Sequence, residues 1–137
     1  MMQTRAQRDL ILAEELVSEV ERERDEVRRI YGGLCHSFPV LVRSCGLCQA
    51  LAFSKDKETA SGGHDSSDHS RAHHLLLRHV GRLLAVSEDD PLKAVREAGV
   101  VEYMLHTRRI LSAWVYFKRF AVSILKVAGA GREDGGT

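Results

Sequence analysis

The chain has 137 residues, 28% of them charged and 44% hydrophobic, and its formal net charge is +1. This length predicts one domain, able to bury ~65–70% of the surface that the unfolded chain would expose. The sequence shows no secretory signal, no run approaching the ~20 apolar residues of a membrane span, and only three cysteines. These features argue against a membrane or secreted protein, and we expect a cytoplasmic one.

The first predicted helix begins after Thr4, whose hydroxyl can cap it. Apolar residues then recur at three- and four-residue intervals past Tyr31, with Arg24 as the one interruption. Residues 14–29 of this helix hold seven acids and four arginines, which suits a solvated surface or a docking face for a basic partner. The glycine pair after Tyr31 predicts a kink or break there, because each glycine weakens a helix by ~1 kcal/mol relative to alanine.

A long apolar stretch follows, and it is predicted to form the core. Between residues 30 and 54 the only fully ionised side chain is Arg43. A second helix is predicted from Pro39 to Ser44, since proline is tolerated in a first helical turn. Gly46 then interrupts it, and a further turn or two covers Leu47–Phe53. The core candidates here are Phe38, Leu41, Val42, Cys45, Leu51 and Phe53.

Residues 57–70 are predicted to be a mobile linker, because they combine Gly, Ser, Asp and Thr with almost no apolar content. A helix is expected at about Asp68–Val86, with Leu76, Val80, Leu83 and Leu84 facing inward. A short helix of about two turns follows Pro91.

The last helix is expected at about Val100–Val127, with a long apolar stripe. Residues 129–137 are predicted to be a disordered tail. Since no segment alternates with period two, the predicted fold is all-α: a compact single domain over residues 1–128, built as a bundle of about five to seven helices.

Several residues could carry chemistry. Cys45 and Cys48 form a CxxC motif, with Cys35 and His36 ten residues before it. This group could bind structural zinc or act as a redox pair, but an apolar helical segment favours cysteines that serve as small core residues. The histidines at 64, 69, 73, 74 and 79 favour a surface histidine-rich segment, since no HExxH completes a hydrolytic site. We therefore predict no metal, no cofactor and no enzymatic activity.

Two predicted helices carry basic stripes. Arg108, Arg119 and Lys126 point within ~20° of one direction at 100° per residue. Arg71, Arg78 and Arg82 likewise share a face, and residues 69–87 and 103–130 contain no acid. Such stripes suit a phosphate backbone, an acidic protein partner, or a solvated face paired with the acidic first helix.

The run from Tyr31 to Lys57 resembles the signature of a known family, the small helical subunit (the fifth protein) of the Cmr complex, the type III-B CRISPR–Cas effector. The residues that carry this resemblance are Tyr31, Pro39, Leu41, Val42, Gly46, Leu47, Gln49, Leu51 and Phe53. Further agreement comes from Thr4-Arg5-Ala6-Gln7 and from Tyr103, Thr107, Trp114, Lys118, Arg119, Phe120 and Ala121. Cys45 departs from the family, which tends to have a small polar residue there, so the CxxC is not predicted to serve the family's function.

The resemblance implies a non-catalytic, all-α subunit that assembles with other Cmr subunits and with further copies of itself beside guide and target RNA. On this interpretation the basic residues make phosphate contacts that position RNA without reading its bases. The predicted RNA-binding residues are Arg43, Lys55, Lys57, Arg78, Arg82, Arg108, Arg109, Lys118, Arg119 and Lys126. The alternatives are a helical DNA-binding or protein-interaction module and a zinc or thiol protein centred on Cys45 and Cys48.

Overall fold

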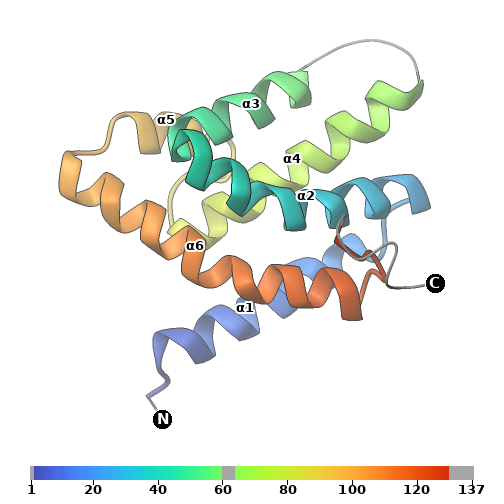
Figure 1. The fold of residues 1–137 in the computed structure, drawn as a ribbon, viewed down its shortest axis with the longest axis horizontal. Helices are drawn as coiled ribbons and strands as arrows, with labels where there is room; N and C mark the ends of the chain where they lie inside the picture. Colours follow the sequence, from blue (N-terminus) through green and yellow to red (C-terminus); the bar gives the residue numbers. More distant parts are fainter. Residues whose placement is uncertain (1, 60–63, 130–137) are drawn as a thin grey trace.

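The computed structural model describes residues 2–59 and 64–129, with side chains in the second range described from residue 67 onward. These residues form six α-helices and no strand, which confirms the all-α prediction (Figure 1). The helices are α1 (Arg5–Val20), α2 (Asp25–Cys45), α3 (Leu47–Thr59), α4 (His64–Leu84), α5 (Pro91–Arg96) and α6 (Val100–Ser123). In the described part of the chain, no helix is both long and apolar enough to span a bilayer.

α1 begins as its sequence predicts. The Thr4 hydroxyl accepts a hydrogen bond from the Gln7 amide at 3.1 Å, and the Gln7 side chain accepts one from the Thr4 amide at 2.7 Å. This reciprocal pair is a capping box. The continuous helix expected beyond Tyr31 is wrong, because the chain leaves the helix at residues 21–24 and restarts with two acids in the first turn of α2. Arg24, the one residue that interrupts the apolar spacing in the sequence, lies at this break.

The break predicted after Tyr31 and the separate helix at Pro39–Ser44 are also wrong, since α2 runs unbroken through both glycines and the proline. Gly32 is buried where the C-terminal segment crosses α2, and a Cβ added there would lie 2.5 Å from the Cβ of Val127. The glycine therefore permits a close approach instead of ending the helix. Gly46 does end α2, as predicted, with φ of +88°.

α3 is longer than predicted, and it changes the exposure of two core candidates. The helix extends from Leu47 to Thr59, so Lys57–Thr59 of the predicted linker are helical, as are residues 64–70 at the start of α4. Residues 60–63 lie outside the described part of the chain. Phe53 on α3 and Cys45 at the end of α2 are exposed, not buried in the core.

The predicted stripe of the last helix forms the centre of the core. Ile110, Trp114, Phe117 and Ala121 are all buried, and the Trp114 and Phe117 rings stack with their centroids 4.1 Å apart. α6 packs between α1 on one side and α2 on the other (Figure 1). Leu76, Val80, Leu83 and Leu84 of α4 are buried as predicted.

The ends of the last two helices differ from the sequence prediction in one respect. Asp90 caps α5, and its carboxylate accepts a hydrogen bond from the Lys93 amide at 3.2 Å. α6 ends at Ser123, and Lys126 lies beyond it with a positive φ of 63°. The expectation that the helix continues to Val127, with Lys126 on its basic stripe, is therefore wrong. Residues 130–137 of the predicted tail lie outside the described part of the chain.

Candidate nucleic-acid interface

The basic stripe of α4 is covered by acids from other elements. Arg71 donates hydrogen bonds from Nε (3.1 Å) and Nη2 (2.8 Å) to the two carboxylate oxygens of Glu23. The remaining two arginines are also paired: Arg78 Nε lies 3.3 Å from Glu88 Oε1, and Arg82 Nη2 lies 3.6 Å from Glu15 Oε1. The Arg71 hydrogen bonds also lower the pKa of Glu23. These arginines form the solvated, acid-paired face that was one of the three interpretations of the sequence.

The basic residues of α6 differ among themselves. Arg108, Lys118 and Arg119 are exposed, and none of them has an ion-pair partner among the described residues. Arg109 points the other way: its Nη2 donates a 2.8 Å hydrogen bond to Oδ1 of Asp9, a buried carboxylate on α1. Arg109 is therefore part of the α1–α6 packing. Lys126 lies beyond the end of α6, and its amine donates a hydrogen bond to the Ser123 carbonyl at 3.0 Å.

The other predicted RNA-binding residues lie near the end of α2 and near the end of α3. Arg43 is exposed and has no ion pair within the described ranges. Lys55 is half-buried and lies 3.2 Å from Glu58 Oε1. Lys57 is exposed, and its ammonium lies 5.3 Å from the centroid of the Phe53 ring. Of the ten predicted residues, four therefore have an acidic partner: Lys55, Arg78, Arg82 and Arg109.

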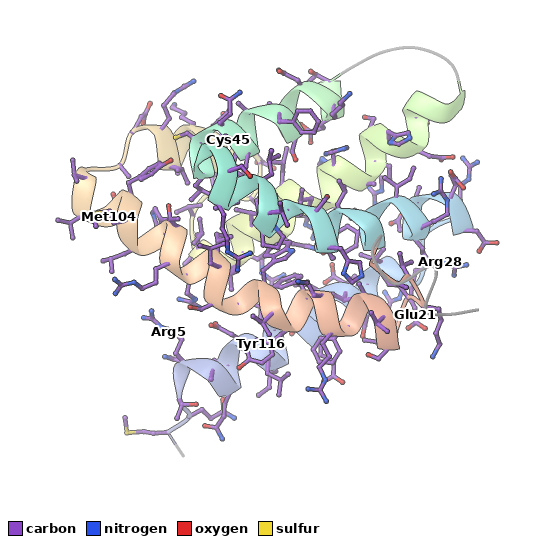
Figure 2. The ribbon with its side chains drawn as sticks, viewed as in Figure 1. Arg5, Glu21, Arg28, Cys45, Met104 and Tyr116 are labelled. Atoms are coloured by element: carbon purple, nitrogen blue, oxygen red, sulfur yellow. The ribbon has the colours of Figure 1, made fainter. Side chains whose placement is uncertain are left out.

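A second feature of α6 was missed in the sequence. Its outer face, opposite Trp114, exposes aliphatic side chains among the cations. Val101 is 71% exposed and Met104 is 61% exposed, and Met104 lies at the edge of the molecule in Figure 2. The outer face of α6 comprises Val101, Met104, Leu105, Arg108, Ser112, Val115, Arg119 and Val122, all exposed at three- and four-residue spacing. The signal was available, because these residues form a second periodic stripe beside the one that forms the core.

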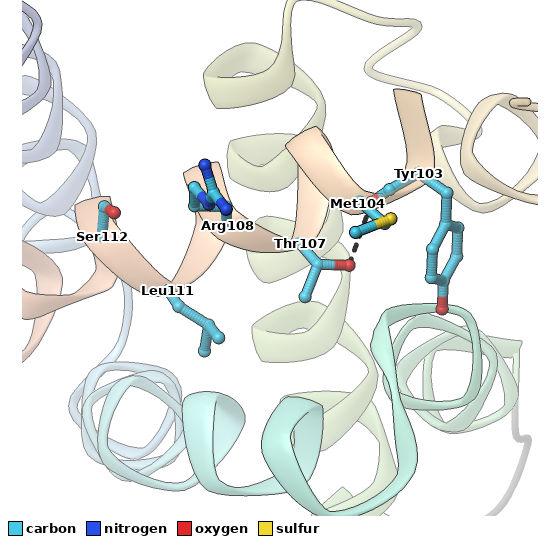
Figure 3. A pocket seen from close by; sticks show the side chains of 6 residues that line it. All are labelled: Tyr103, Met104, Thr107, Arg108, Leu111 and Ser112. Carbon is cyan, nitrogen blue, oxygen red and sulfur yellow. Dashed lines mark hydrogen bonds between the residues drawn. The ribbon is translucent and has the colours of Figure 1, made fainter. Parts of the chain in front are cut away.

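A shallow hollow of about 570 Å³ runs along one flank of α6, and its lining residues lie between Tyr103 and Ser112 of this helix (Figure 3). The Thr107 hydroxyl donates to the Tyr103 carbonyl at 3.1 Å, and Met104, Arg108 and Leu111 also line the hollow. The Tyr103 phenol oxygen accepts a 3.0 Å hydrogen bond from the Cys48 amide, one of the unpaired donors at the start of α3. This contact fixes the beginning of α6 to the junction of α2 and α3.

α1 presents the opposite charge on an exposed apolar surface. Leu10 and Ile11 are exposed beside Glu14, which has no ion pair within residues 2–59 and 64–129. This acidic face of α1, made of Leu10, Ile11 and Glu14, shares the exposed apolar character of the outer face of α6 and carries the opposite charge.

The three cysteines lie at different places in the fold. Cys45 ends α2, Cys48 lies in the first turn of α3, and Cys35 is buried, which raises its pKa well above that of a free thiol. Across the described residues, no three His, Cys, Asp or Glu side chains are arranged to hold a metal ion.

The two buried histidines of α4 form internal hydrogen bonds. The Tyr31 hydroxyl lies 2.6 Å from His79 Nδ1, and Ser54 Oγ lies 3.2 Å from His73 Nδ1. Burial lowers the pKa of His79 to about 3 and that of His73 to about 4, so both are neutral at pH 7.

Known proteins similar to this chain agree with the resemblance found in its sequence. A family model described as CRISPR-associated protein (Cas_Cmr5) matches residues 3–124. The CRISPR system Cmr subunit Cmr5 of Thermus thermophilus is 34% identical over 129 residues, covering 91% of this chain and 99% of the relative. The crystal structure of a CRISPR-associated Cmr5 family protein, also from Thermus thermophilus, matches with a TM-score of 0.71 and 33% identity, over 90% of this chain and 98% of that one. This chain therefore belongs to the Cmr5 family of CRISPR-associated proteins.

Proposed function

We propose that this protein is a non-catalytic small subunit of a type III-B Cmr ribonucleoprotein, acting in the cytoplasm in defence against invading nucleic acid. In this role it binds other Cmr subunits and further copies of itself, and it contacts the backbone of guide and target RNA. The observation that carries the proposal is the outer face of α6, which combines exposed aliphatic side chains with two arginines that have no acidic partner among the described residues.

The RNA contacts in this proposal are the cations that no carboxylate neutralises. A phosphate backbone competes poorly for an arginine that already binds a carboxylate, because the existing ion pair must first be broken. This criterion retains Arg43, Lys57, Arg108, Lys118, Arg119 and Lys126, and it leaves out the four residues with acidic partners. Three of the retained residues lie on α6, where no acid follows Glu102.

The protein contacts are assigned to the start of α6, where aliphatic residues predominate. Val100, Val101, Met104 and Leu105 are all more than half exposed within the first two turns of the helix. Contiguous exposed apolar side chains of this kind mark interaction sites more often than isolated ones do. The acidic face of α1 supports self-association, because a second copy could place Leu10, Ile11 and Glu14 against the apolar and arginine side chains of α6.

The test is co-purification of the tagged protein from its native host, with nuclease treatment and identification of bound proteins and RNAs. The wild type is expected to bring down other Cmr subunits with short CRISPR guide RNAs. Reversing Arg108 and Arg119 to Glu should reduce the retained RNA, whereas Met104→Glu should reduce the retained subunits. Arg22→Glu, an exposed arginine before α2, is the matched charge control.

Two results would contradict the proposal. A wild-type protein recovered alone would remove the assembly role. Full RNA retention by the Arg108→Glu, Arg119→Glu variant in an intact assembly would remove these residues from the RNA interface.

A further inference from the structure

A crevice of about 870 Å³ lies between α2 and the α3–α4 pair, away from the outer face of α6. Its apolar walls include Leu34, Phe38 and Leu41 of α2, Phe53 of α3 and Leu76 of α4. The volume falls in the range of pockets that hold small organic ligands, about 300–1,000 Å³. Of the proposed backbone contacts, Lys57 adjoins this crevice, because its ammonium lies over the ring of Phe53, which lines it.

Two buried polar side chains line the crevice. Ser54 is 2% exposed and His73 is 3% exposed, and Ser54 Oγ lies 3.2 Å from His73 Nδ1. No group in the described part of the chain forms a hydrogen bond with the other ring nitrogen, Nε2 of His73. Because burial keeps this imidazole neutral at pH 7, its ring offers one donor and one acceptor. One of the two remains for a ligand.

The mouth of the crevice combines an aromatic ring with a cation. Phe53 is 45% exposed, and its ring meets that of His73 edge to face, with centroids 6.2 Å apart. The Lys57 ammonium lies over the Phe53 ring and has no ion pair within the described ranges. An aromatic surface, a nearby cation and a recess with hydrogen-bonding groups are the elements that bind unpaired nucleotides.

We propose that this crevice binds an unpaired nucleobase, stacked on Phe53 and hydrogen-bonded through His73 and Ser54, with Lys57 on the adjoining phosphate. The inference rests on the proposed RNA role and extends it, since backbone contacts alone leave bases unread. An aliphatic protein side chain fits the recess less well, because it would leave Nε2 of His73 without a hydrogen-bond partner. A base edge carries donors and acceptors that can satisfy them.

The test is an NMR titration of the full 15.3 kDa chain with adenosine monophosphate, uridine monophosphate and, separately, inorganic phosphate. Either nucleotide is expected to shift the signals of Phe53, Ser54 and His73, whereas inorganic phosphate should leave these three signals unchanged. Phe53→Leu should weaken nucleotide binding about tenfold, since loss of one base-stacking contact has effects of that order. Phe53 is exposed enough for this variant to fold.

Two matched variants separate the stacking contact from charge. Lys57→Met should lower the affinity for the monophosphates toward that for the uncharged nucleosides, while shifts at Phe53 and His73 persist. Arg119→Glu on α6 should leave the crevice titration unchanged, so the backbone contacts can fail in co-purification while this site still binds.

Nucleotide shifts confined to α6, or equal affinity of wild type and Phe53→Leu, would overturn the proposal. Loss of a Cmr subunit from the Phe53→Leu assembly without any nucleotide shift in wild type would assign the crevice to a protein side chain and would also overturn it.

Discussion

The helices α4 and α6 carry similar basic stripes, each within a segment that has no acid (residues 69–84 and 103–123), yet their surroundings differ. Each of the three α4 arginines lies opposite a glutamate from α1, from the turn after α1, or from the loop before α5. On α6, Arg108, Lys118 and Arg119 face no acid in the described part of the chain. A helix's own sequence therefore shows where positive charge lies, and its neighbours decide whether that charge can bind an external anion.

Among the substitutions, the largest expected effect comes from Asp9→Ala, because Arg109 is the one cation of α6 described above that binds a buried carboxylate. The substitution leaves the half-buried Arg109 guanidinium without its carboxylate, and we expect a loss of about 2–3 kcal/mol in the free energy of unfolding. Urea denaturation measures it. Arg119→Ala is the control and should change stability by less than about 0.5 kcal/mol. A loss below about 1 kcal/mol for Asp9→Ala would mean that this ion pair is no more important than those of α4.

Acidification should destabilise the α4 side of the molecule through its two buried histidines. In the unfolded chain both histidines are protonated near the ordinary histidine pKa of 6.5. In the fold, His73 is protonated only at about pH 4 and His79 only at about pH 3. Stability is therefore full above pH 6.5 and decreases below it, by up to ~1.4 kcal/mol per pH unit for each histidine. Below pH 4.5 the lowered pKa values of Glu23 and Glu58 add a loss in the same direction.

Urea midpoints between about pH 7 and pH 5 test this expectation, with His73→Gln as the matched variant. Removing one of the two buried histidines should roughly halve the pH dependence in this range. Equal slopes for wild type and variant would show that His73 does not contribute.

RNA-binding measurements should show directly that the basic stripe of α6 contributes more to RNA affinity than that of α4. Reversing Arg108 and Arg119 to Glu is expected to weaken RNA binding by the assembled complex at least about tenfold and to reduce the slope of log affinity against log salt by about 2. Reversing Arg71 and Arg78 should have an effect of less than about threefold, because both already bind carboxylates. Filter binding at several salt concentrations measures both, and equal losses would contradict the assignment.

The smallest expected effect concerns the pairs on α4. A double-mutant cycle between Arg71 and Glu23 should give a coupling free energy of about 0.2–1 kcal/mol, since both side chains are partly exposed and screened by solvent. The bidentate geometry places the value toward the upper end. A coupling above about 2 kcal/mol would make this pair structural, as Asp9 and Arg109 are.

The sequence correctly predicted those features of the fold that depend on residues only a few positions apart in the chain. The Thr4 cap, the end of α2 at Gly46 and the buried stripe through Trp114 each follow from spacing or backbone preference within a few positions. The glycine pair was misread, because the reason for Gly32 is the crossing of Val127, which is 95 positions further along the chain.

The candidate interface shows the same limit. Which cations are available depends on where α1 and the loop before α5 place their acids, and Phe53 is exposed because α3 turns another face toward α4. The local pattern of charged and apolar residues predicts neither of these facts, because both depend on residues distant in the sequence.

The uninterrupted length of α6 has a consequence for the assembled particle. The helix has 24 residues, so it is about 36 Å long, and the 18 positions from Val101 to Arg119 span about 27 Å. If one end meets a protein and the other meets RNA, this separation is set by backbone hydrogen bonds and cannot stretch as a loop would. Each copy would then act as a spacer that holds the nucleic acid at a constant offset from the subunit junction. A kink in the middle of α6 would change that offset while leaving both binding surfaces intact.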